Sequence, residues 1–373
     1  MAVLIGMDFS SLEEVEGFGG VFLDGGKPDK LPAILARHGV KAARLRLWLD
    51  PHDSNGEGYG AGTCDLACVV RLAKRAKAEG MKILLDFHYS DFWVDPAKQT
   101  MPKAWKDLSF EQVVEEIYKY TRDSLAVMRA EGVYPDMVQV GNEITHGMLW
   151  PLGKLEWHLP DELPGQLDRL AKMLDAGCRA VRESGDAQIM LHLENSGNNE
   201  LWRNWFDAMV ERGADFDLIG ASYYPVWHGK LSKLKANMDD MAQRYGKPIQ
   251  IVETAYAFTT IPHEACSVSG VANSVPEITA DGTPPEFPYT KEGQRDFLMA
   301  LVDMVENIHG GLGAGLWYWE PGWLPMMGTT WATEAARIYV DEAHKEGGNE
   351  WAHLCLFDYE GEATPALLAF GEK

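Results

Sequence analysis

Short apolar runs recur along the whole chain, and amphipathic stretches of helical length separate them. The apolar runs predict strands over residues 3–9, 42–49, 82–89, 137–144, 188–194, 218–224, 248–254 and 313–319. The amphipathic stretches predict helices over 28–38, 65–79, 110–131, 161–184, 200–212, 230–245 and 291–308. Strands that alternate with helices pair in parallel through right-handed crossovers, so the expected fold class is α/β. Eight such strands favour a closed single (β/α)8 TIM barrel over an open sheet.

The pattern predicts one catalytic domain over residues 1–373, without a linker. The length suits a barrel of this kind as a single unit. No Gly-x-Gly-x-x-Gly turn follows the first predicted strand, which argues against a dinucleotide-binding domain. The one long irregular stretch, residues 257–289, contains several prolines. We expect it to be the seventh βα loop and to fold over a cleft.

The balance of charges bears on the class of partner. Lys and Arg number 34 against 56 Asp and Glu, which gives a formal net charge of −22. Nucleic acids and anionic membranes attract basic patches, so we expect no nucleic-acid partner and no membrane partner. A neutral polymer would be indifferent to this charge. The charge also keeps a protein soluble, and that simpler explanation stays open.

The cysteines and the first residues bear on the compartment. Five cysteines, an odd number, are scattered along the chain. Cys64 and Cys68 lie close together but have no second pair with which to form a zinc site. Unpaired thiols are typical of a reducing compartment. No leader peptide is recognisable at the start. The sequence as it stands predicts a cytoplasmic protein, or a secreted one if a leader has been removed.

Polar and aromatic side chains gather where the predicted strands end. They are Asp8, Arg44, Arg46, His88, Asp91, Asn142, Glu143, His192, Glu194, Asn195, Tyr223, Glu253 and Trp319. The carboxyl ends of barrel strands converge on one mouth, where barrel enzymes place their active sites. The chain also has 13 Trp, and aromatic rings in a cleft suit the apolar faces of sugars. Trp317 and Trp319 are expected on opposite faces of the last strand, with one of them in the core.

Two glutamates follow predicted strands on different sides of the barrel. Glu143 ends the fourth strand and Glu253 ends the seventh. Two carboxyls that share a pocket can divide the roles of acid and nucleophile if their surroundings separate their pKa values. A retaining glycosidase needs the two about 5–5.5 Å apart, whereas an inverting one needs about 6.5–9.5 Å. Arg44 on the second strand could hold Glu253 ionised. A single glutamate would more simply be a salt-bridged strand end.

Several segments together give the chain a resemblance to a known family. They read Asp86-Phe-His-Tyr-Ser-Asp-Phe-Trp-Val-Asp-Pro96, Gly141-Asn-Glu-Ile, Gly147-Met-Leu-Trp-Pro151, Ser222-Tyr-Tyr-Pro225, Val252-Glu-Thr-Ala-Tyr256 and Tyr318-Trp-Glu-Pro321. Here the chain resembles the endo-β-1,4-galactanases of glycoside hydrolase family 53. The resemblance implies retaining endo-hydrolysis of β-1,4-galactosidic linkages by double displacement. It makes galactan or (arabino)galacto-oligosaccharides the expected substrate.

The resemblance also implies a role for each matching residue. Glu143 would be the acid/base and Glu253 the nucleophile. The residues implied to bind substrate are Arg44, His88, Asp91, Trp93, Asn142, Trp150, His192, Asn195, Tyr223, Trp227, His228 and Trp319. The chain departs from the family after the fifth strand. The family reads His-Leu-Asp-Asn-Gly, whereas this chain reads His192-Leu-Glu-Asn-Ser196, which puts the usual subsite contacts in question.

No cofactor and no metal site are expected. Bacterial relatives in this family often carry calcium in the seventh loop. The acidic residues that this chain offers there are widely spaced: Glu264, Glu277, Asp281 and Glu286. Calcium requires six to eight oxygen ligands, so calcium is possible but unsupported by the sequence. His88 and His192 lack the spacing of zinc ligands.

Other functions compete with this interpretation. One is a sugar-binding barrel without turnover, although both glutamates are present. Another is a different retaining endo-glycanase of the same clan, acting on mannan or xylan. Segments 86–91 and 318–321 favour a galactanase over these. A metal-dependent barrel hydrolase would need ligands that the sequence lacks.

Overall fold

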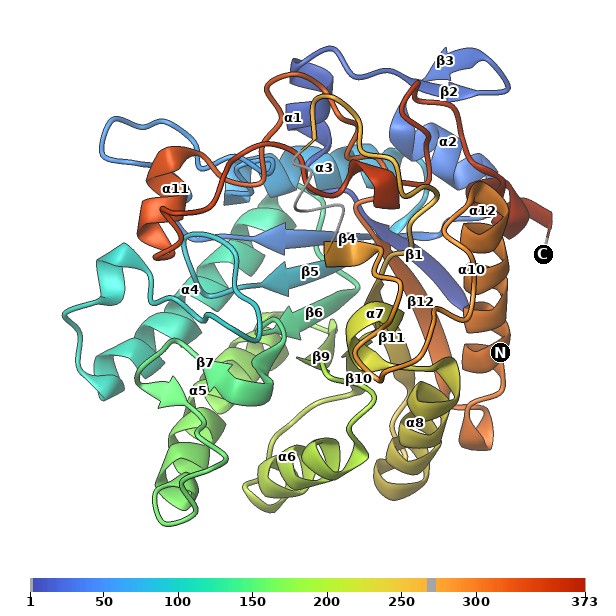
Figure 1. The fold of residues 1–373 in the computed structure, drawn as a ribbon. Coiled ribbons are helices and arrows are strands. Elements are labelled where there is room, and N and C mark those ends of the chain that lie inside the picture. Colours follow the sequence, from blue (N-terminus) through green and yellow to red (C-terminus); the bar gives the residue numbers. More distant parts are fainter. Residues whose placement is uncertain (1–2, 267–272, 373) are drawn as a thin grey trace.

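Eight parallel strands close into a barrel at the centre of the molecule (Figure 1). The structure is a computed structural model, and it describes residues 3–266 and 273–372. The barrel strands are β1 (Leu4–Asp8), β4 (Ala42–Leu47), β5 (Lys82–Phe87), β6 (Met137–Val140), β9 (Gln188–Leu193), β10 (Leu218–Ser222), β11 (Ile249–Thr254) and β12 (Gly313–Trp319). Each pairs with the next barrel strand along the chain, and β12 closes the barrel against β1. The predicted (β/α)8 barrel is confirmed.

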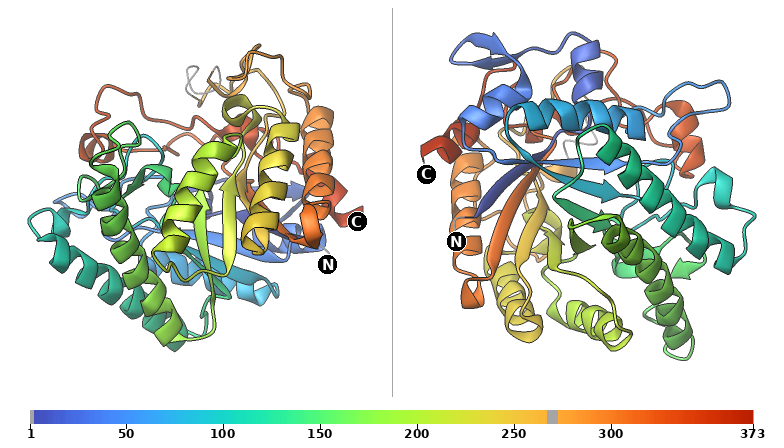
Figure 2. Two further views of the ribbon diagram at one scale, coloured as in Figure 1. Left: turned by 90° about the horizontal axis from the view of Figure 1, so that it is seen from below. Right: turned by 180° about the vertical axis from the view of Figure 1, so that it is seen from behind.

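Helices connect the strands on the outside of the barrel (Figure 2). The longer ones are α2 (Leu31–Arg37), α3 (Leu66–Ala78), α4 (Phe110–Ala130), α5 (Leu163–Ser184), α6 (Asn199–Glu211), α8 (Leu231–Tyr245) and α10 (Lys291–Glu306). Asp65 accepts a hydrogen bond from the backbone of Cys68 before α3, and Ser109 forms a capping box with Gln112 before α4. Such caps satisfy backbone N–H groups that have no partner inside the helix. Both helices therefore begin within a residue of the predicted position.

The largest difference from a predicted helix boundary lies at the start of α2. β2 (Phe22–Asp24) and β3 (Lys27–Asp29) form an antiparallel hairpin, so the helix expected from residue 28 begins only at Leu31. Pro28, which suggests a helix start, lies in an exposed edge strand, a position that proline also tolerates. The remaining short elements are α1 (Leu12–Gly17), β7 (Gly147–Met148), β8 (Gly153–Lys154), α7 (Pro225–His228), α11 (Glu334–Tyr339), α12 (Pro365–Leu368) and 3₁₀ turns at Lys103–Trp105, Ile144–His146, His309–Gly311, Ala352–Leu354 and Ala369–Glu372.

The inward faces of the strands change from apolar to polar along the barrel. An apolar layer closes the barrel interior with Ala42, Leu84, Met137, Met190, Leu218, Val252 and Trp317. Residues two apart on a strand share a face. The next inward positions of β4, β5 and β9 are therefore Arg44, Asp86 and His192, and all three are buried. This polar layer forms the floor on which the active-site cavity rests.

The two tryptophans of β12 follow the same rule. Trp317 is fully buried in the apolar layer, as expected for one of the pair. Trp319, two residues further along, lines the cavity above it. The prediction that the two point to opposite faces is wrong, because residues two apart on a strand share a face.

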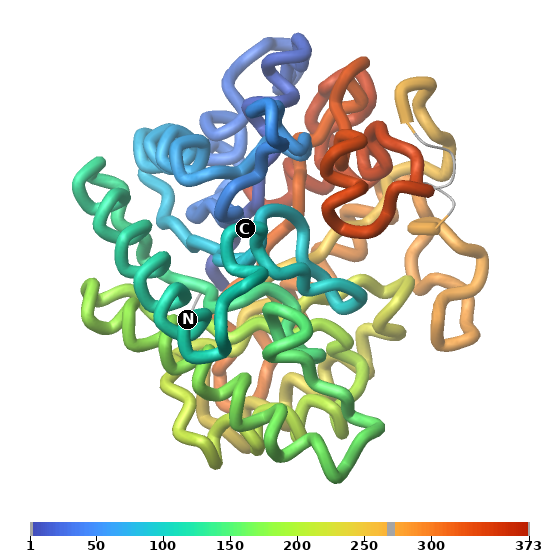
Figure 3. Tube along the Cα trace, turned by 90° about the vertical axis from the view of Figure 1, so that its left-hand side faces the viewer, coloured from blue at the N-terminus to red at the C-terminus, as the bar shows by residue number. Residues whose placement is uncertain are grey.

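Long loops gather over the C-terminal ends of the strands (Figure 3). The loop after β5 and the loop after β12 lie side by side there, and Lys98 of the first pairs with Glu342 of the second at 3.4 Å. Residues 267–272 of the predicted seventh loop lie outside the described residues. Over residues 3–266 and 273–372, no helix is both long and apolar enough to cross a membrane.

Candidate active site

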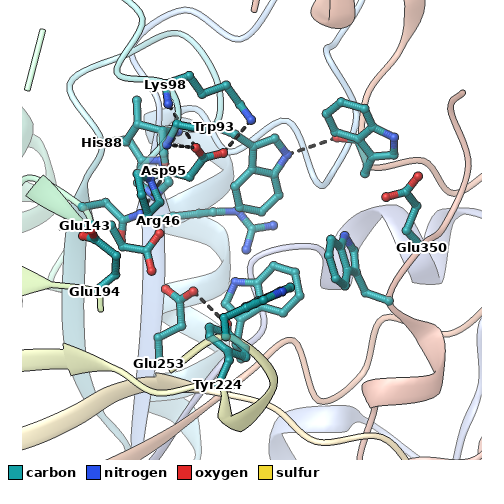
Figure 4. Close-up of a pocket in the computed structure, with 18 of the residues that line it drawn as sticks. Arg46, His88, Trp93, Asp95, Lys98, Glu143, Glu194, Tyr224, Glu253 and Glu350 are labelled. Carbon is teal, nitrogen blue, oxygen red and sulfur yellow. Dashed lines mark hydrogen bonds and ion pairs between the residues drawn. The ribbon is translucent and has the colours of Figure 1, made fainter. Parts of the chain in front are cut away.

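A cavity of about 500 Å³ opens at the C-terminal ends of the barrel strands. The predicted site residues that line it are Arg44, His88, Trp93, Asn142, Glu143, Trp227, His228, Glu253 and Trp319. They come from strands and loops far apart in the sequence, and the closed barrel brings them together, as Figure 4 shows for His88, Trp93, Glu143 and Glu253. The predicted strand-end residues in this set therefore share one mouth: Arg44, His88, Asn142, Glu143, Glu253 and Trp319.

Both carboxylate oxygens of Glu253 accept hydrogen bonds. The Arg44 guanidinium donates to Oε2 at 2.9 Å. The Tyr224 hydroxyl donates to Oε1 at 2.8 Å, as Figure 4 shows. Burial raises the pKa of Glu253, whereas the charge of Arg44 and the hydrogen bond from Tyr224 oppose that rise. The predicted contact between Arg44 and Glu253 is confirmed. It favours the ionised form of this carboxyl.

Arg44 itself is fixed by further acceptors beneath the cavity. It donates to Asp8 at 3.2 Å, to Asp86 at 2.8 Å and to Asn142 Oδ1 at 2.8 Å. Its side chain is only 2% exposed, so the guanidinium depends on these partners for the interactions that water would otherwise supply. The result is an immobile positive charge directly beside Glu253.

Glu143 follows β6 in an unusual backbone conformation. Its φ is +50°, in the left-handed region that residues with a side chain seldom adopt and that recurs at functional sites. Its Oε1 accepts a hydrogen bond from Ser222 Oγ at 2.6 Å. Burial and the nearby charges of Glu253 and Glu194 raise the pKa of Glu143 well above its usual range. The protonated form of this carboxyl is therefore favoured.

The two glutamates approach each other closely. One carboxylate oxygen of Glu143, one of Glu253 and one ring nitrogen of His192 all lie within 4.8 Å of one another. This spacing is near the 5–5.5 Å of retaining glycosidases and shorter than the roughly 6.5 Å at which inverting geometries begin. Within the described part of the chain, no other three His, Cys, Asp or Glu side chains come together in this way. Each of the three side chains also has a hydrogen-bond partner: Ser222 contacts Glu143 and His192, and Arg44 contacts Glu253.

His192 lies beneath the cavity rather than on its surface. It is fully buried, with Nε2 at 2.8 Å from Ser222 Oγ and Nδ1 at 3.0 Å from Asn142 Oδ1. Burial and the charge of Arg44 lower its pKa well below the usual value, so the ring is neutral. The structure therefore places this predicted substrate-binding residue among the supports of the site.

Tyr223 is not in the cavity, and its neighbour Tyr224 is. Tyr223 is fully buried outside the barrel interior, stacks on Phe297 and donates to the Gly229 carbonyl at 2.9 Å. Ser222 faces the interior, so the residue two further along, Tyr224, faces it as well. The sequence prediction chose the wrong member of the Tyr-Tyr pair, because a one-residue difference in register exchanges the two faces.

Three other predicted substrate-binding residues lie away from the lining of this cavity. Asp91 is buried and accepts from the backbones of Asp50 (3.1 Å) and Lys103 (2.7 Å), so it joins two loops. Asn195 adopts a φ of +58° at the turn after β9. Trp150 lines a second cavity of about 860 Å³ next to the first. None of these three residues therefore lines the cavity that contains Glu143 and Glu253.

The loop that rims the cavity is the eighth rather than the seventh. Trp331, Glu350 and Trp351 follow β12 and line the cavity, whereas none of the described residues of 257–289 does. The described part of the seventh loop instead supports the eighth, because Phe258 N–H donates to the His353 carbonyl at 2.9 Å. The expectation that the seventh loop folds over the cleft is wrong for these residues.

Several lining residues are absent from the predicted set. Arg46 lies near the end of β4, and Glu194 and Tyr224 follow β9 and β10. The sequence analysis placed Arg46 and Glu194 at strand ends but assigned neither a role in substrate binding, and it did not select Tyr224. Trp331 and Trp351 belong to an irregular loop without periodicity, so no sequence pattern points to them. The Trp93 indole N–H donates to the Trp331 carbonyl at 3.1 Å, which connects the loop after β5 with the loop after β12 (Figure 4).

Tryptophans around two buried carboxyls form a surface for a carbohydrate. Two carboxyls close together at the C-terminal strand ends of a barrel form the arrangement that retaining glycoside hydrolases use. Residues 4–370 match the profile of glycosyl hydrolase family 53. The chain belongs to that family.

Known relatives cover nearly the whole chain. An uncharacterized protein in the bgaB 5′ region of Niallia circulans is 40% identical over 99% of this chain and 93% of its own length. The endo-β-1,4-galactanase of Bacillus subtilis is 35% identical over 98% of this chain and 84% of its own length. Among solved structures, the GH53 catalytic domain from Ignisphaera aggregans superposes with a TM-score of 0.86 at 33% identity, covering 98% of this chain and 95% of that one.

Proposed function

We propose that this glycoside hydrolase is an endo-β-1,4-galactanase that cleaves galactan or (arabino)galacto-oligosaccharides with retention of configuration. One observation carries the mechanism: Glu143 and Glu253 lie at a retaining distance, and of these two glutamates only Glu253 accepts hydrogen bonds from Arg44 and Tyr224. Membership of family 53 and the likeness to the Bacillus subtilis endo-β-1,4-galactanase support the choice of substrate.

In the first step Glu253 acts as the nucleophile and Glu143 as the acid. A Glu253 oxygen forms a bond to the anomeric carbon while the glycosidic bond breaks. The electron pair of that bond leaves with the glycosidic oxygen, which takes the proton of Glu143. Arg44 and Tyr224 support this step because they favour the ionised nucleophile, and burial beside Glu253 keeps Glu143 protonated.

In the second step Glu143 acts as the base. It takes a proton from water as the water oxygen bonds to the anomeric carbon, and the ester bond to Glu253 breaks. Glu253 recovers its negative charge beside Arg44, and Glu143 is protonated again for the next cycle. Two displacements at one carbon restore the original configuration, so the product is the β-anomer.

Asn142 is the neighbour that we expect to contact a sugar hydroxyl. Its Oδ1 accepts from Arg44, and its Nδ2 donates to the Val94 carbonyl at 3.0 Å. An amide nitrogen carries two hydrogens, so one remains for the substrate. The orientation of Asn142 is fixed on both sides before the sugar binds, which lowers the entropic cost of recognition.

We further propose that the reaction requires no metal ion. In the seventh loop the Asp281 carboxylate accepts from the hydroxyls of Thr279 and Thr283, both at 2.7 Å. Glu286 accepts from the backbone N–H of Leu231 at 2.8 Å. These oxygens have structural partners, which supports the proposal that they are not part of a calcium shell.

The deciding experiment compares three polymers. We expect purified protein to release oligosaccharides from potato galactan, with far less product from mannan and from xylan under the same conditions. Chromatography of the products at early times distinguishes internal cleavage, which gives mixed lengths, from release of one small sugar. Equal or faster hydrolysis of mannan or xylan would reject the substrate assignment. Binding without product would indicate a sugar-binding barrel.

A further inference from the structure

A continuous set of polar contacts runs behind the cavity from Glu143 to Glu253. Ser222 Oγ contacts Glu143 Oε1 at 2.6 Å and His192 Nε2 at 2.8 Å. His192 Nδ1 in turn lies 3.0 Å from Asn142 Oδ1, which accepts from Arg44. Ser222 and His192 are both fully buried. A buried hydroxyl and a buried neutral imidazole between the acid and its neighbours can control where hydrogens lie.

The partners of His192 determine which ring nitrogen carries its hydrogen. Two donors point at Nδ1: the backbone N–H of Glu143 at 3.4 Å and the Gln139 amide nitrogen at 3.0 Å. The Asn142 oxygen beside Nδ1 already accepts from Arg44. Asp86 takes one of the two hydrogens of the Gln139 amide at 2.5 Å, which leaves the other for Nδ1. A neutral imidazole has one N–H and one acceptor nitrogen. Nδ1 is therefore the acceptor, and the hydrogen lies on Nε2, directed at Ser222.

The hydrogen of Ser222 is then also determined. The hydroxyl oxygen accepts from His192 Nε2, so its single hydrogen is free to point the other way. The atom in that direction is Glu143 Oε1 at 2.6 Å. Within the described residues, no protein donor contacts the second oxygen of Glu143, Oε2. The two oxygens of this carboxyl thus have different surroundings.

We propose that Ser222 and His192 are positioning residues that keep Oε1 of Glu143 as a hydrogen-bond acceptor and confine the transferred proton to Oε2. The inference rests on the proposed role of Glu143 as acid/base. A carboxyl whose proton could lie on either oxygen would present it to the glycosidic oxygen only part of the time. Neither residue contacts the substrate in this scheme, and each acts through Glu143.

The charges around Glu143 give the scheme a measurable consequence. Glu253 from β11, Glu194 from the end of β9 and Asp95 from the loop after β5 all raise the pKa of Glu143, as does its burial. Tyr224 and His192 are further ionisable groups nearby, and both are uncharged at neutral pH. Arg44, the fixed cation, contacts Glu253 and Asn142. The donation from Ser222 opposes the rise, because it stabilises the ionised carboxylate.

The test compares Ser222→Ala with Ser196→Ala. Ser196 is also buried and donates to the Ser222 carbonyl at 2.7 Å, so its variant removes a neighbouring hydroxyl that has no contact with Glu143. We expect Ser222→Ala to lower kcat/KM on galactan about 10- to 100-fold, the effect of one lost hydrogen bond to a charged group. In the pH profile of kcat/KM of this variant, the basic limb reports the loss of the Glu143 proton. That limb should move about one pH unit upward. In Ser196→Ala and Ser222→Thr, the basic limb should lie at the same pH as in the wild-type protein.

A second measurement addresses His192 directly and needs no activity. In protein with ¹⁵N-labelled histidine, NMR should show His192 neutral with its hydrogen on Nε2, and Ser222→Ala should perturb that resonance. A hydrogen on Nδ1, or a basic limb unmoved in folded Ser222→Ala, would overturn the inference. If the wild-type protein were inactive on galactan, the proposed function would be rejected instead. The NMR result would still decide which ring nitrogen of His192 carries the hydrogen.

Discussion

The surroundings of Glu253 and Glu143 differ although the two residues are of one type and share one cavity. Glu253 has a donor on each oxygen, and one of these donors is the fixed cation of Arg44. Glu143 has one neutral donor, Ser222, and its charged neighbours are carboxyls that disfavour its ionisation. The same side chain is thereby suited to opposite tasks, since the placement of neighbouring donors and charges decides which one keeps its proton.

The largest effect on activity should follow from replacing Glu253, the carboxylate with a hydrogen-bond donor on each oxygen. Glu253→Gln keeps the shape and the possible contacts with Arg44 and Tyr224, but an amide cannot form the glycosyl ester. We expect kcat on galactan to fall by more than about a thousandfold while the circular dichroism spectrum and Tm stay near wild type. A folded variant that retains a tenth of the wild-type rate would contradict the role of Glu253.

Removing Glu143 should give a different signature. Glu143→Ala should lower the rate on galactan about 10²- to 10⁴-fold, because the leaving group of a natural linkage needs a proton. An activated aryl galactooligosaccharide needs none, so its first step should be largely spared and the second step should become slow. Added azide needs no base and should restore turnover with a β-galactosyl azide as product.

The azide product also discriminates between the possible mechanisms. An α-azide would show inversion. Rescue in Glu253→Ala but not in Glu143→Ala would require the two roles to be exchanged.

The donor set of Glu253 can be tested with two adjacent tyrosines. Tyr224→Phe removes the hydrogen bond to Oε1, whereas Tyr223→Phe removes a hydroxyl that only contacts the Gly229 carbonyl. We expect Tyr224→Phe to lower kcat/KM about 10- to 100-fold. The pKa of Glu253 should rise, so the acidic limb of the pH profile should move to higher pH. Equal effects of the two variants would contradict the placement of Tyr224 in the cavity.

A variant of Glu194 tests whether neighbouring negative charge raises the pKa of Glu143. Burial raises the pKa of Glu194 to about 7, against the hydrogen bond from Thr145, and its charge raises the pKa of Glu143. Glu194→Gln should therefore move the basic limb of kcat/KM to lower pH. An unmoved limb would show that the charge of Glu194 does not reach Glu143.

The same variant should change stability with pH. A carboxyl whose pKa is higher in the folded state stabilises the fold at low pH and loses that contribution as pH rises from about 4.5 to about 7. The loss is at most about 3 kcal/mol, and the glutamine variant avoids it. The Tm of Glu194→Gln relative to wild type should thus be higher at pH 8 than at pH 5. A difference independent of pH would contradict the raised pKa.

The smallest effect is expected from removing metals. Because the reaction is proposed to require no metal ion, EDTA should leave activity unchanged and shift Tm by no more than about a degree. A fall of several degrees that calcium reverses would show that an ion contributes to the fold, because an ion that binds only the native state stabilises it.

The sequence by itself determined the barrel and the two glutamates. Apolar strands of period two that alternate with helices leave few topologies, because each strand must bury both faces and each crossover is right-handed. The position of Glu143 and Glu253 at the carboxyl ends of two such predicted strands was enough to place both at the same mouth. The Arg44 contact followed from the same reasoning, since Arg44 occupies the inward face of β4.

Only the tertiary structure decided the remaining geometry. Whether Tyr223 or Tyr224 faces Glu253 depends on the register at the end of β10, and a shift of one residue exchanges the faces. Whether Asp91 binds sugar or joins loops depends on backbone N–H groups from segments far along the chain. The tryptophans of the eighth loop lie in irregular structure, which has no period that a sequence could reveal. Strand periodicity is a local property, whereas loop contacts and the environment of a carboxyl arise from segments that meet only when the barrel closes.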